Sequence, residues 1–256
     1  MLIDTHCHLF MEPLRSDIHG VLKRAAGKGV SAIIVPAVET SSWKRVAELS
    51  EYPGVYPAFG LHPWCADERF DADMLGELLM KAGSVAVGEI GLDFKIDNPD
   101  RSIQITVFRM QLDLAAELGL PVILHCRRAF DEMLSILSET RYNGRIRGVV
   151  HGFSRGRQLA DRFLELGFYL AFGGAVTRTR AKRARSSAAA VPLHRIVLET
   201  DSPSIGMDGV EPEEMEPAHV ARIADSLALL RGISPEEVSF ETAGNARKLF
   251  GIGEDR

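Results

Sequence analysis

Eight short apolar runs, each followed by a segment with helical periodicity, constrain the fold of this chain more than any other feature. In chain order the runs read LIDTH, SAIIVPA, VYPAFGL, SVAVGEIG, PVILHC, RGVVHGF, FYLAFGG and RIVLETD. Near-continuous hydrophobic strands that alternate with helices are typical of parallel strands buried on both faces. Eight such units predict an α/β fold closed into a single (β/α)8 TIM barrel, with an open doubly wound sheet as the alternative.

Helical segments fill the intervals between the runs and continue past the eighth. The segment SIQITVFRMQLDLAAELGL stops at Gly119, a residue type that often ends helices. After the last run, PAHVARIADSLALLRG and SPEEVSFETAGNARKLFG predict additional C-terminal helices, the second of them capped by Ser234. No linker or repeat divides the chain, and 256 residues is an ordinary length for one barrel. We therefore expect a single domain over residues 1–256.

Side chains that can bind metal ions stand at the ends of six of these runs. In parallel barrels, catalytic residues come from the C-terminal ends of strands and from the loops just after them. The residues at these ends are His6, His8, His62, Glu89, His125, His151 and Asp201. Because all the ends meet at one rim, the pattern predicts a cluster of imidazoles and carboxylates there. His19, His194 and His219 fall elsewhere, and we expect them at the surface.

The opening segment places two imidazoles two residues apart, with Cys7 between them. Side chains alternate faces along a strand, so Asp4, His6 and His8 are expected to point one way and Cys7 the other. Two adjacent buried imidazoles are costly unless something binds them. A metal ion would do so, and so would hydrogen bonds within the core.

The donor set at the predicted rim favours two divalent metal ions over one. Neutral imidazoles and carboxylates suit first-row divalent metals such as zinc or manganese, whereas magnesium and calcium prefer all-oxygen sites. Four histidines with Glu89 and Asp201 exceed what one tetrahedral ion needs. Glu89 is the candidate bridge between the ions, because it comes from the middle of the strand order.

Net charge and cysteine content limit the partners and the location that can be expected. The formal net charge of −5 argues against a general polyanion binder, so any attraction for phosphate must be local. The odd count of three cysteines lacks the spacing of a metal finger and indicates reduced thiols in a cytoplasmic protein. Cys7 and Cys126 are expected in the core. Neither a signal peptide nor a membrane anchor is apparent, and the oligomeric state stays open, with a monomer compatible.

The motifs IDTHCHL, GLHP, VAVGEIGLDF, PVILHCR, GVVHGFS and LETDSP, in this order and spacing, closely resemble the TatD-type metal-dependent hydrolases. That family, which includes deoxyribonucleases, belongs to the amidohydrolase-like barrel superfamily and is often described as magnesium-dependent. The resemblance extends to the C-terminal NARKLF and so covers essentially the whole chain.

The resemblance implies a division of the donors between two ions. Its first ion would be held by His6, His8, Glu89 and Asp201. Its second ion would be held by Glu89, His125 and His151. Asp201 would also orient or deprotonate the attacking water, and His62 would lie near the substrate as a phosphate contact; packing before Pro63 is the alternative for His62.

Cationic residues after the ligand-bearing runs point to an anionic substrate. Arg127 follows His125 directly, and arginine suits bidentate recognition of phosphate. Two departures from the family weaken the prediction of a long nucleic-acid substrate. Arg155 stands where the family usually has glycine. The loop over residues 211–216 carries four glutamates that would repel a long nucleic acid. A short strand end or a small phosphoester tolerates that loop better.

These observations predict a divalent-metal-dependent hydrolase with Asp201 and Glu89 as catalytic residues and His62 and Arg127 as substrate contacts. The leading hypothesis is a deoxyribonuclease that trims single-stranded DNA ends by hydroxide attack at a two-metal centre, with zinc, manganese or magnesium as the metal. One alternative keeps the site but hydrolyses a small phosphoester, lactone or amide. Another is a non-catalytic barrel that binds a ligand at its rim.

Overall fold

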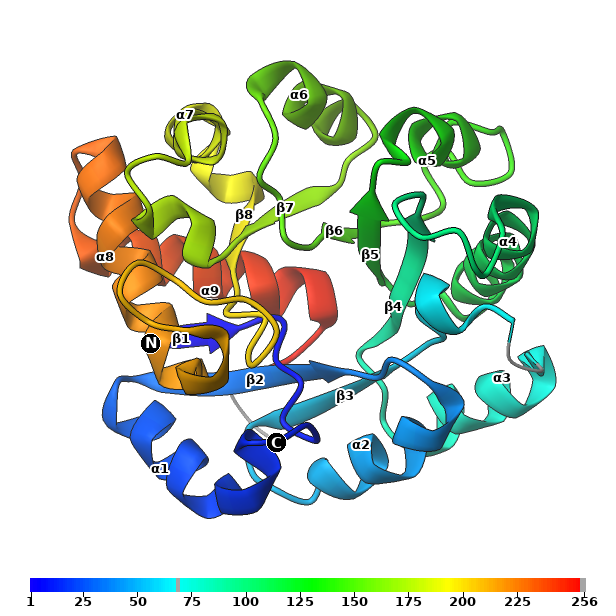
Figure 1. Cartoon of the computed structure of the whole chain (residues 1–256), viewed down its shortest axis with the longest axis horizontal. Helices are drawn as coiled ribbons and strands as arrows, with labels where there is room; N and C mark the ends of the chain where they lie inside the picture. The colour runs from blue at the N-terminus through cyan, green and yellow to red at the C-terminus, as the bar shows by residue number, and fades with distance from the viewer. Residues whose placement is uncertain (68–69, 254–256) are drawn as a thin grey trace.

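A computed structural model, which describes residues 1–67 and 70–253, contains eight parallel strands arranged in chain order around a nearly closed barrel (Figure 1). Each strand pairs in parallel with the next along the chain. The strands are β1 (Leu2–Asp4), β2 (Val30–Pro36), β3 (Val55–Phe59), β4 (Ala86–Asp93), β5 (Val122–Arg127), β6 (Gly148–Val150), β7 (Tyr169–Phe172) and β8 (Ile196–Leu198). A doubly wound sheet would reverse its strand order, so this order confirms the predicted barrel.

Over the residues that the structure describes, helices follow each strand, seven of them between successive strands on the outside of the barrel and the last two after β8 (Figure 1). They are α1 (Ile18–Gly27), α2 (Trp43–Leu49), α3 (Ala72–Lys81), α4 (Arg101–Leu118), α5 (Phe130–Leu137), α6 (Arg157–Glu165), α7 (Lys182–Ala190), α8 (Val220–Arg231) and α9 (Pro235–Phe250). As predicted, α4 ends at Gly119, which has a left-handed backbone, and Ser234 caps α9 by accepting a hydrogen bond from the Glu237 amide. Within residues 1–67 and 70–253, every helix is too short or too polar to cross a bilayer.

The seam between the first and last strands is closed by the residues that follow them. The Thr5 amide donates to the Leu198 carbonyl at 3.0 Å, and the Asp201 amide donates to the His6 carbonyl at 2.8 Å. Cys7 and Ser202 form an isolated parallel bridge in the same seam. The two chain segments richest in proposed ligands therefore hold each other in place.

Three strands end before the proposed metal ligands that follow them. β1, β6 and β8 end at Asp4, Val150 and Leu198, so His6, His8, His151 and Asp201 lie just past strand ends rather than within strands. The reason is that their backbones bond across the rim: the His8 amide donates to the Ser202 carbonyl and the His151 amide to the Leu124 carbonyl.

The opposite end of the barrel is closed by α9. Ala243, Ala246, Leu249 and Phe250 of this helix pack against inward-facing strand residues such as Ile34 in one buried cluster. The additional C-terminal helices therefore include a plug for the barrel as well as a covering helix.

Asn245 on α9 supports a prediction about stability. Its buried side-chain amide donates to the carbonyls of Leu193 and Ile196 at 2.8 and 2.7 Å, just before and at the start of β8. Asn245→Ala leaves two carbonyls without their donor, so we expect the free energy of unfolding to fall by about 1–3 kcal/mol in urea denaturation. Lys248→Ala, at an exposed position of the same helix, is the control and should change stability by less than about 0.5 kcal/mol. Equal urea midpoints for the two variants would refute this role of Asn245.

Candidate metal centre

Glu89 lies at the centre of the predicted cluster, and its two carboxylate oxygens face different sets of imidazoles. Oε1 lies 2.8 Å from His125 Nδ1 and 2.8 Å from His151 Nε2. Oε2 lies 3.2 Å from His6 Nε2 and 3.8 Å from His8 Nε2. Only 2% of Glu89 is exposed, so this carboxylate meets the four imidazoles almost without water.

Asp201 approaches the cluster from the side of the barrel seam. Its Oδ1 atom lies 3.5 Å from His8 Nε2 and 3.9 Å from His6 Nε2. The residue has a left-handed backbone with φ of 52°, a conformation that aspartate tolerates better than most residues. The structure thus brings all six predicted metal ligands to one mouth of the barrel.

Gly91 allows β4 and β5 to approach closely enough for Glu89 to meet His125. Gly91 pairs with His125 in the register of the two strands and has φ of 144°. A Cβ atom on Gly91 would lie 2.0 Å from the His125 carbonyl oxygen, a distance no side chain could accept. Gly91, the second glycine of GEIGLD, is therefore required for the site to form.

The electrostatics of the cluster follow from burying opposite charges together. Although burial alone would raise it, the charges of His151 and His62 hold the pKa of Glu89 well below its usual range. Burial lowers the pKa of His6 to about 4. Burial also disfavours charge on His151, but the carboxylate of Glu89 outweighs that effect and raises the pKa of His151 to about 10. Glu89 is therefore ionised, and the imidazoles around it differ widely in basicity.

The donor atoms fit divalent cations. His6 Nε2 lies 3.2 Å from His8 Nε2, and His125 Nδ1 lies 3.2 Å from His151 Nε2. Lone pairs of neutral imidazoles at such separations repel unless a proton or a cation lies between them. Three groups of donors within 4.8 Å of one another could each hold an ion: His6 with Glu89 and His151, His6 with His8 and Asp201, and His62 with Glu89 and His125.

His62 is more closely involved than the sequence indicates. Its Nε2 atom lies 3.4 Å from Glu89 Oε1, while its Nδ1 atom accepts a hydrogen bond from the Trp64 amide. The ring is buried and lies edge-on to His125, with centroids 4.3 Å apart. The imidazole faces into the donor cluster, whereas packing alone would not require it to point at Glu89.

Asp93 is a site residue that sequence reasoning missed. This buried carboxylate lies 3.5 Å from His125 Nε2 and accepts a hydrogen bond from Trp64 Nε1 at 2.8 Å. Although burial opposes it, hydrogen bonds from His125 and Trp64 hold the pKa of Asp93 below its ordinary value. Metal-ligating histidines commonly donate their second ring nitrogen to a carboxylate, which fixes the tautomer. The signal for Asp93 in the sequence was the presence of an acidic residue four positions after Glu89 on a strand expected to be buried.

Two further buried carboxylates hold the ligand-bearing segments together. Asp4 accepts hydrogen bonds from the amide and hydroxyl of Thr200 at 2.9 and 2.6 Å. It therefore turns toward β8 and does not join His6 and His8 as strand alternation predicts. Glu199 accepts from the Gly152 amide at 2.5 Å, which ties the end of β8 to the segment after β6.

A cavity of about 390 Å³ opens over the cluster and is lined by arginine and aromatic side chains. Arg127 lines it from the end of β5, with its guanidinium 3.8 Å from Asp93 Oδ2. Arg155, the residue that replaces the usual glycine, also lines it, and so does Trp64, which is 51% exposed. Both predicted substrate contacts thus lie near the donors, His62 among them and Arg127 at the wall of the cavity.

The remaining histidines and two cysteines lie outside the donor cluster. His19 and His194 are exposed, while half-buried His219 accepts a hydrogen bond from the Glu216 amide. Cys7 is fully buried beside Ser202, as expected. Cys126 is not in the core as expected: it is half-buried and lines the cavity over the donors, although burial still raises its pKa to about 12.

A family profile and curated relatives show which family this chain is similar to. The profile of the family described as "TatD related DNase" matches residues 3–251. The chain is 39% identical over 255 residues to the "Uncharacterized metal-dependent hydrolase YjjV" of Escherichia coli K12, with 98% of each protein covered. It is 34% identical to the metal-dependent hydrolase YabD of Bacillus subtilis 168, covering 98% of this chain and 100% of that protein. The crystal structure of E. coli YjjV, described as a TatD homologue, superposes with a TM-score of 0.90 at 38% identity over 98% of both chains.

The double substitution His6→Ala and His8→Ala tests the donor set. Because both Nε2 atoms face Glu89 and Asp201, we expect the purified protein to lose at least half of its bound divalent metal, measured by mass spectrometry of the metal. The exposed histidines His19 and His194, both changed to alanine, provide the control. Full metal content in the first variant would exclude the opening pair as ligands.

Asp93→Asn tests the positioning of His125. Asparagine keeps an oxygen that can accept but loses the negative charge that strengthens the interaction with His125, so metal affinity should fall about 10–100-fold in competition with a fluorescent chelator. Asp97→Asn, at an exposed position after the same strand, should leave the affinity unchanged. An unaltered affinity in Asp93→Asn would show that His125 needs no such partner.

Proposed function

The chain belongs to the TatD related DNase family of metal-dependent hydrolases, and from that premise we propose that it cleaves phosphodiester bonds at the ends of single-stranded DNA. The observation that carries the proposal is the bridging position of Glu89. Its two oxygens face separate sets of imidazoles directly beneath an arginine-lined cavity. This is the arrangement that a pair of ions acting on a phosphate requires.

The residues present would hold two divalent ions. One ion would be held by His6, His8, Glu89 and Asp201, and the other by Glu89, His125 and His151. When bound, such a pair polarises the phosphoryl group and lowers the pKa of a water molecule. The imidazole content favours zinc or manganese over magnesium by donor type.

Asp201 is proposed to accept the proton of the attacking water. It lies at the edge of the donor cluster and lines the cavity where the substrate would enter. Although burial opposes it, the hydrogen bond with His8 holds the pKa of Asp201 below its ordinary value, so the carboxylate is ionised and able to accept. Glu89 keeps the imidazoles in place and compensates positive charge.

Arg127 and Arg155 favour a phosphate over a lactone or an amide. Both line the cavity above the donors, and a guanidinium offers paired N–H groups that match two phosphoryl oxygens. Trp64 adds an exposed indole at the same cavity, against which a base can stack. A neutral ester or amide offers neither a phosphate for the guanidinium groups nor a base for the indole.

Asp201→Asn tests this assignment. We expect kcat on a labelled single-stranded oligonucleotide to fall about 10²–10⁴-fold, the usual effect of losing a general base, while bound metal stays near the parent level. Asp208→Asn, exposed in the same loop, is the matched control.

The same assays should include p-nitrophenyl esters, lactones and small phosphoesters at equal metal content. Turnover of a lactone, an amide or a small phosphoester in preference to DNA would replace the proposed substrate. Undiminished turnover by Asp201→Asn would remove Asp201 from its role.

A further inference from the structure

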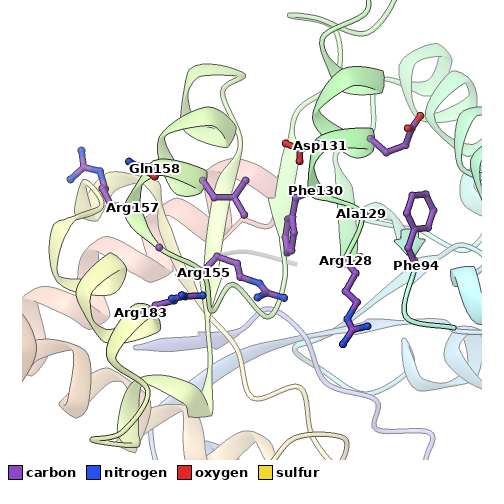
Figure 2. Close-up of a pocket in the computed structure, with 12 residues that line it drawn as sticks. Phe94, Arg128, Ala129, Phe130, Asp131, Arg155, Arg157, Gln158 and Arg183 are labelled. Carbon is purple, nitrogen blue, oxygen red and sulfur yellow. The ribbon is translucent and has the colours of Figure 1, made fainter.

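A second, larger cavity of about 830 Å³ adjoins the one above the metal donors. It lies between the segments that begin α5 and α6, with α7 contributing one lining residue (Figure 2). Phe130 and Arg155 line both cavities, so the two lie side by side and share part of their walls. We call this second cavity the arginine groove, after the four arginines in its lining: Arg128, Arg155, Arg157 and Arg183.

The arginine groove holds positive charge that the protein leaves available. Arg128 and Arg183 are exposed and have no ion-pair or hydrogen-bond partner in the described parts of the chain. Arg157, by contrast, pairs with Asp161 and donates to the Ala190 carbonyl. In a chain with a net charge of −5, two free guanidinium groups beside a catalytic cavity form a local exception.

The acidic side chains of the groove do not cancel this charge. Asp131 is held by Arg162, with Nη1 and Oδ1 2.6 Å apart, so its charge is already compensated. Glu132 is the other acidic residue of the lining. Among residues 1–67 and 70–253, the lining therefore has three arginines without a carboxylate partner, Arg128, Arg155 and Arg183, and one acid without a cation.

Aromatic rings stand between the cations. In the view of Figure 2, Arg183 and Arg155, then Phe130, Arg128 and Phe94 follow one another across the groove. The guanidinium of Arg155 lies 5.0 Å from the centroid of Phe130, and both phenylalanines are half-buried. Guanidinium groups for the backbone and rings for the bases are the two components that proteins combine to hold single-stranded nucleic acids.

The backbone at Arg128 directs a side chain into the groove at an energetic cost. Its φ of 57° is in the left-handed region, which arginine rarely adopts. Residues in such conformations cluster at functional sites, where the surrounding structure holds them.

The glutamates of residues 211–216 lie elsewhere and do not oppose this path. Glu216 forms an ion pair with Arg24 of α1 at 2.8 Å, and Glu211 and Glu214 cap their own short turn. In Figure 1 this segment, drawn in gold, lies beside α8 and β1, away from α5 and α6. The glutamates that the sequence predicts to repel a nucleic acid therefore lie across the barrel mouth from the arginine groove.

We propose that the arginine groove binds the nucleotides that adjoin the one at the metal centre, which makes a polynucleotide strand, rather than a dinucleotide or a small phosphoester, the preferred substrate. This inference rests on the proposed function. The phosphates of the strand would contact Arg128, Arg155 and Arg183, and bases would stack on Phe130 and Phe94.

The test compares the parent protein with the double variant Arg128→Asn and Arg183→Ala. Asparagine is chosen because it tolerates the left-handed backbone at position 128. The control is Arg180→Ala with Lys182→Ala, two exposed residues outside the groove lining that change the net charge equally. All three proteins should have the same thermal unfolding midpoint.

Binding of a fluorescent 12-nucleotide single strand is measured by anisotropy at several salt concentrations. Each phosphate contact contributes about 0.7 to the slope of log affinity against log salt for single strands, so the groove variant should lose about 1.4 from that slope. The control should keep the parent slope. An unchanged slope in the groove variant, or equal competition by polyglutamate of the same charge, overturns the inference.

Hydrolysis supplies the second measurement. For the metal-loaded parent, kcat/KM on the 12-mer should exceed that on a dinucleotide at least tenfold, and the groove variant should bring this ratio close to one. Equal rates on both substrates in the parent would overturn the groove while leaving the proposed function intact. Absence of hydrolysis on every oligonucleotide, with the difference in salt slope preserved, would instead overturn the proposed function and support the groove as a binding site.

Discussion

The burial of Glu89 among five imidazoles is the interaction on which the rest of the site depends. An isolated carboxylate that is 2% exposed would cost several kcal/mol to desolvate, and only close opposite charge or a bound cation compensates for it. The partners come from four different parts of the chain: the segment after β1 and the region of β3, β5 and β6. The charge of Glu89 is therefore compensated only when the barrel closes, because an open sheet could not bring those segments to a single carboxylate.

Much of this arrangement could be predicted, because strand direction alone determines which residues meet. Parallel strands place their C-terminal ends at one rim, so His125 and Asp201 are brought together without any knowledge of loop structure. Contacts that depend on side-chain direction could not be predicted. Asp4 follows the strand alternation of His6 yet turns to Thr200, because the seam beside β8 offers it an amide and a hydroxyl.

The same limit explains the residues that the sequence pattern did not reveal. In the sequence, Asp93 only marks the end of an apolar strand. The structure shows its role, because His125 Nε2 lies 3.5 Å from its carboxylate. Arg183 sits in a run of cations in which most charges point to solvent, and only the packing of α7 beside α6 brings this one to the groove. Similarly, the sequence alone suggests that the glutamates after β8 repel a nucleic acid, but the ion pair between Glu216 and Arg24 holds the end of this segment beside α1.

The donors also differ in how firmly the fold holds them. His125 pairs with Gly91 in the ladder of β4 and β5, while Glu89 lies in β4 at a shift of that register, where its amide donates to the Ala37 carbonyl at 3.1 Å. His6, His8, His151 and Asp201 lie past the ends of β1, β6 and β8, where single backbone hydrogen bonds across the rim position them. Side chains on regular strands are positioned more precisely than those on connecting segments. In the proposed centre, a buried carboxylate shared by donors on connecting segments would accommodate ions of different radius, so donor geometry alone would not select one divalent metal.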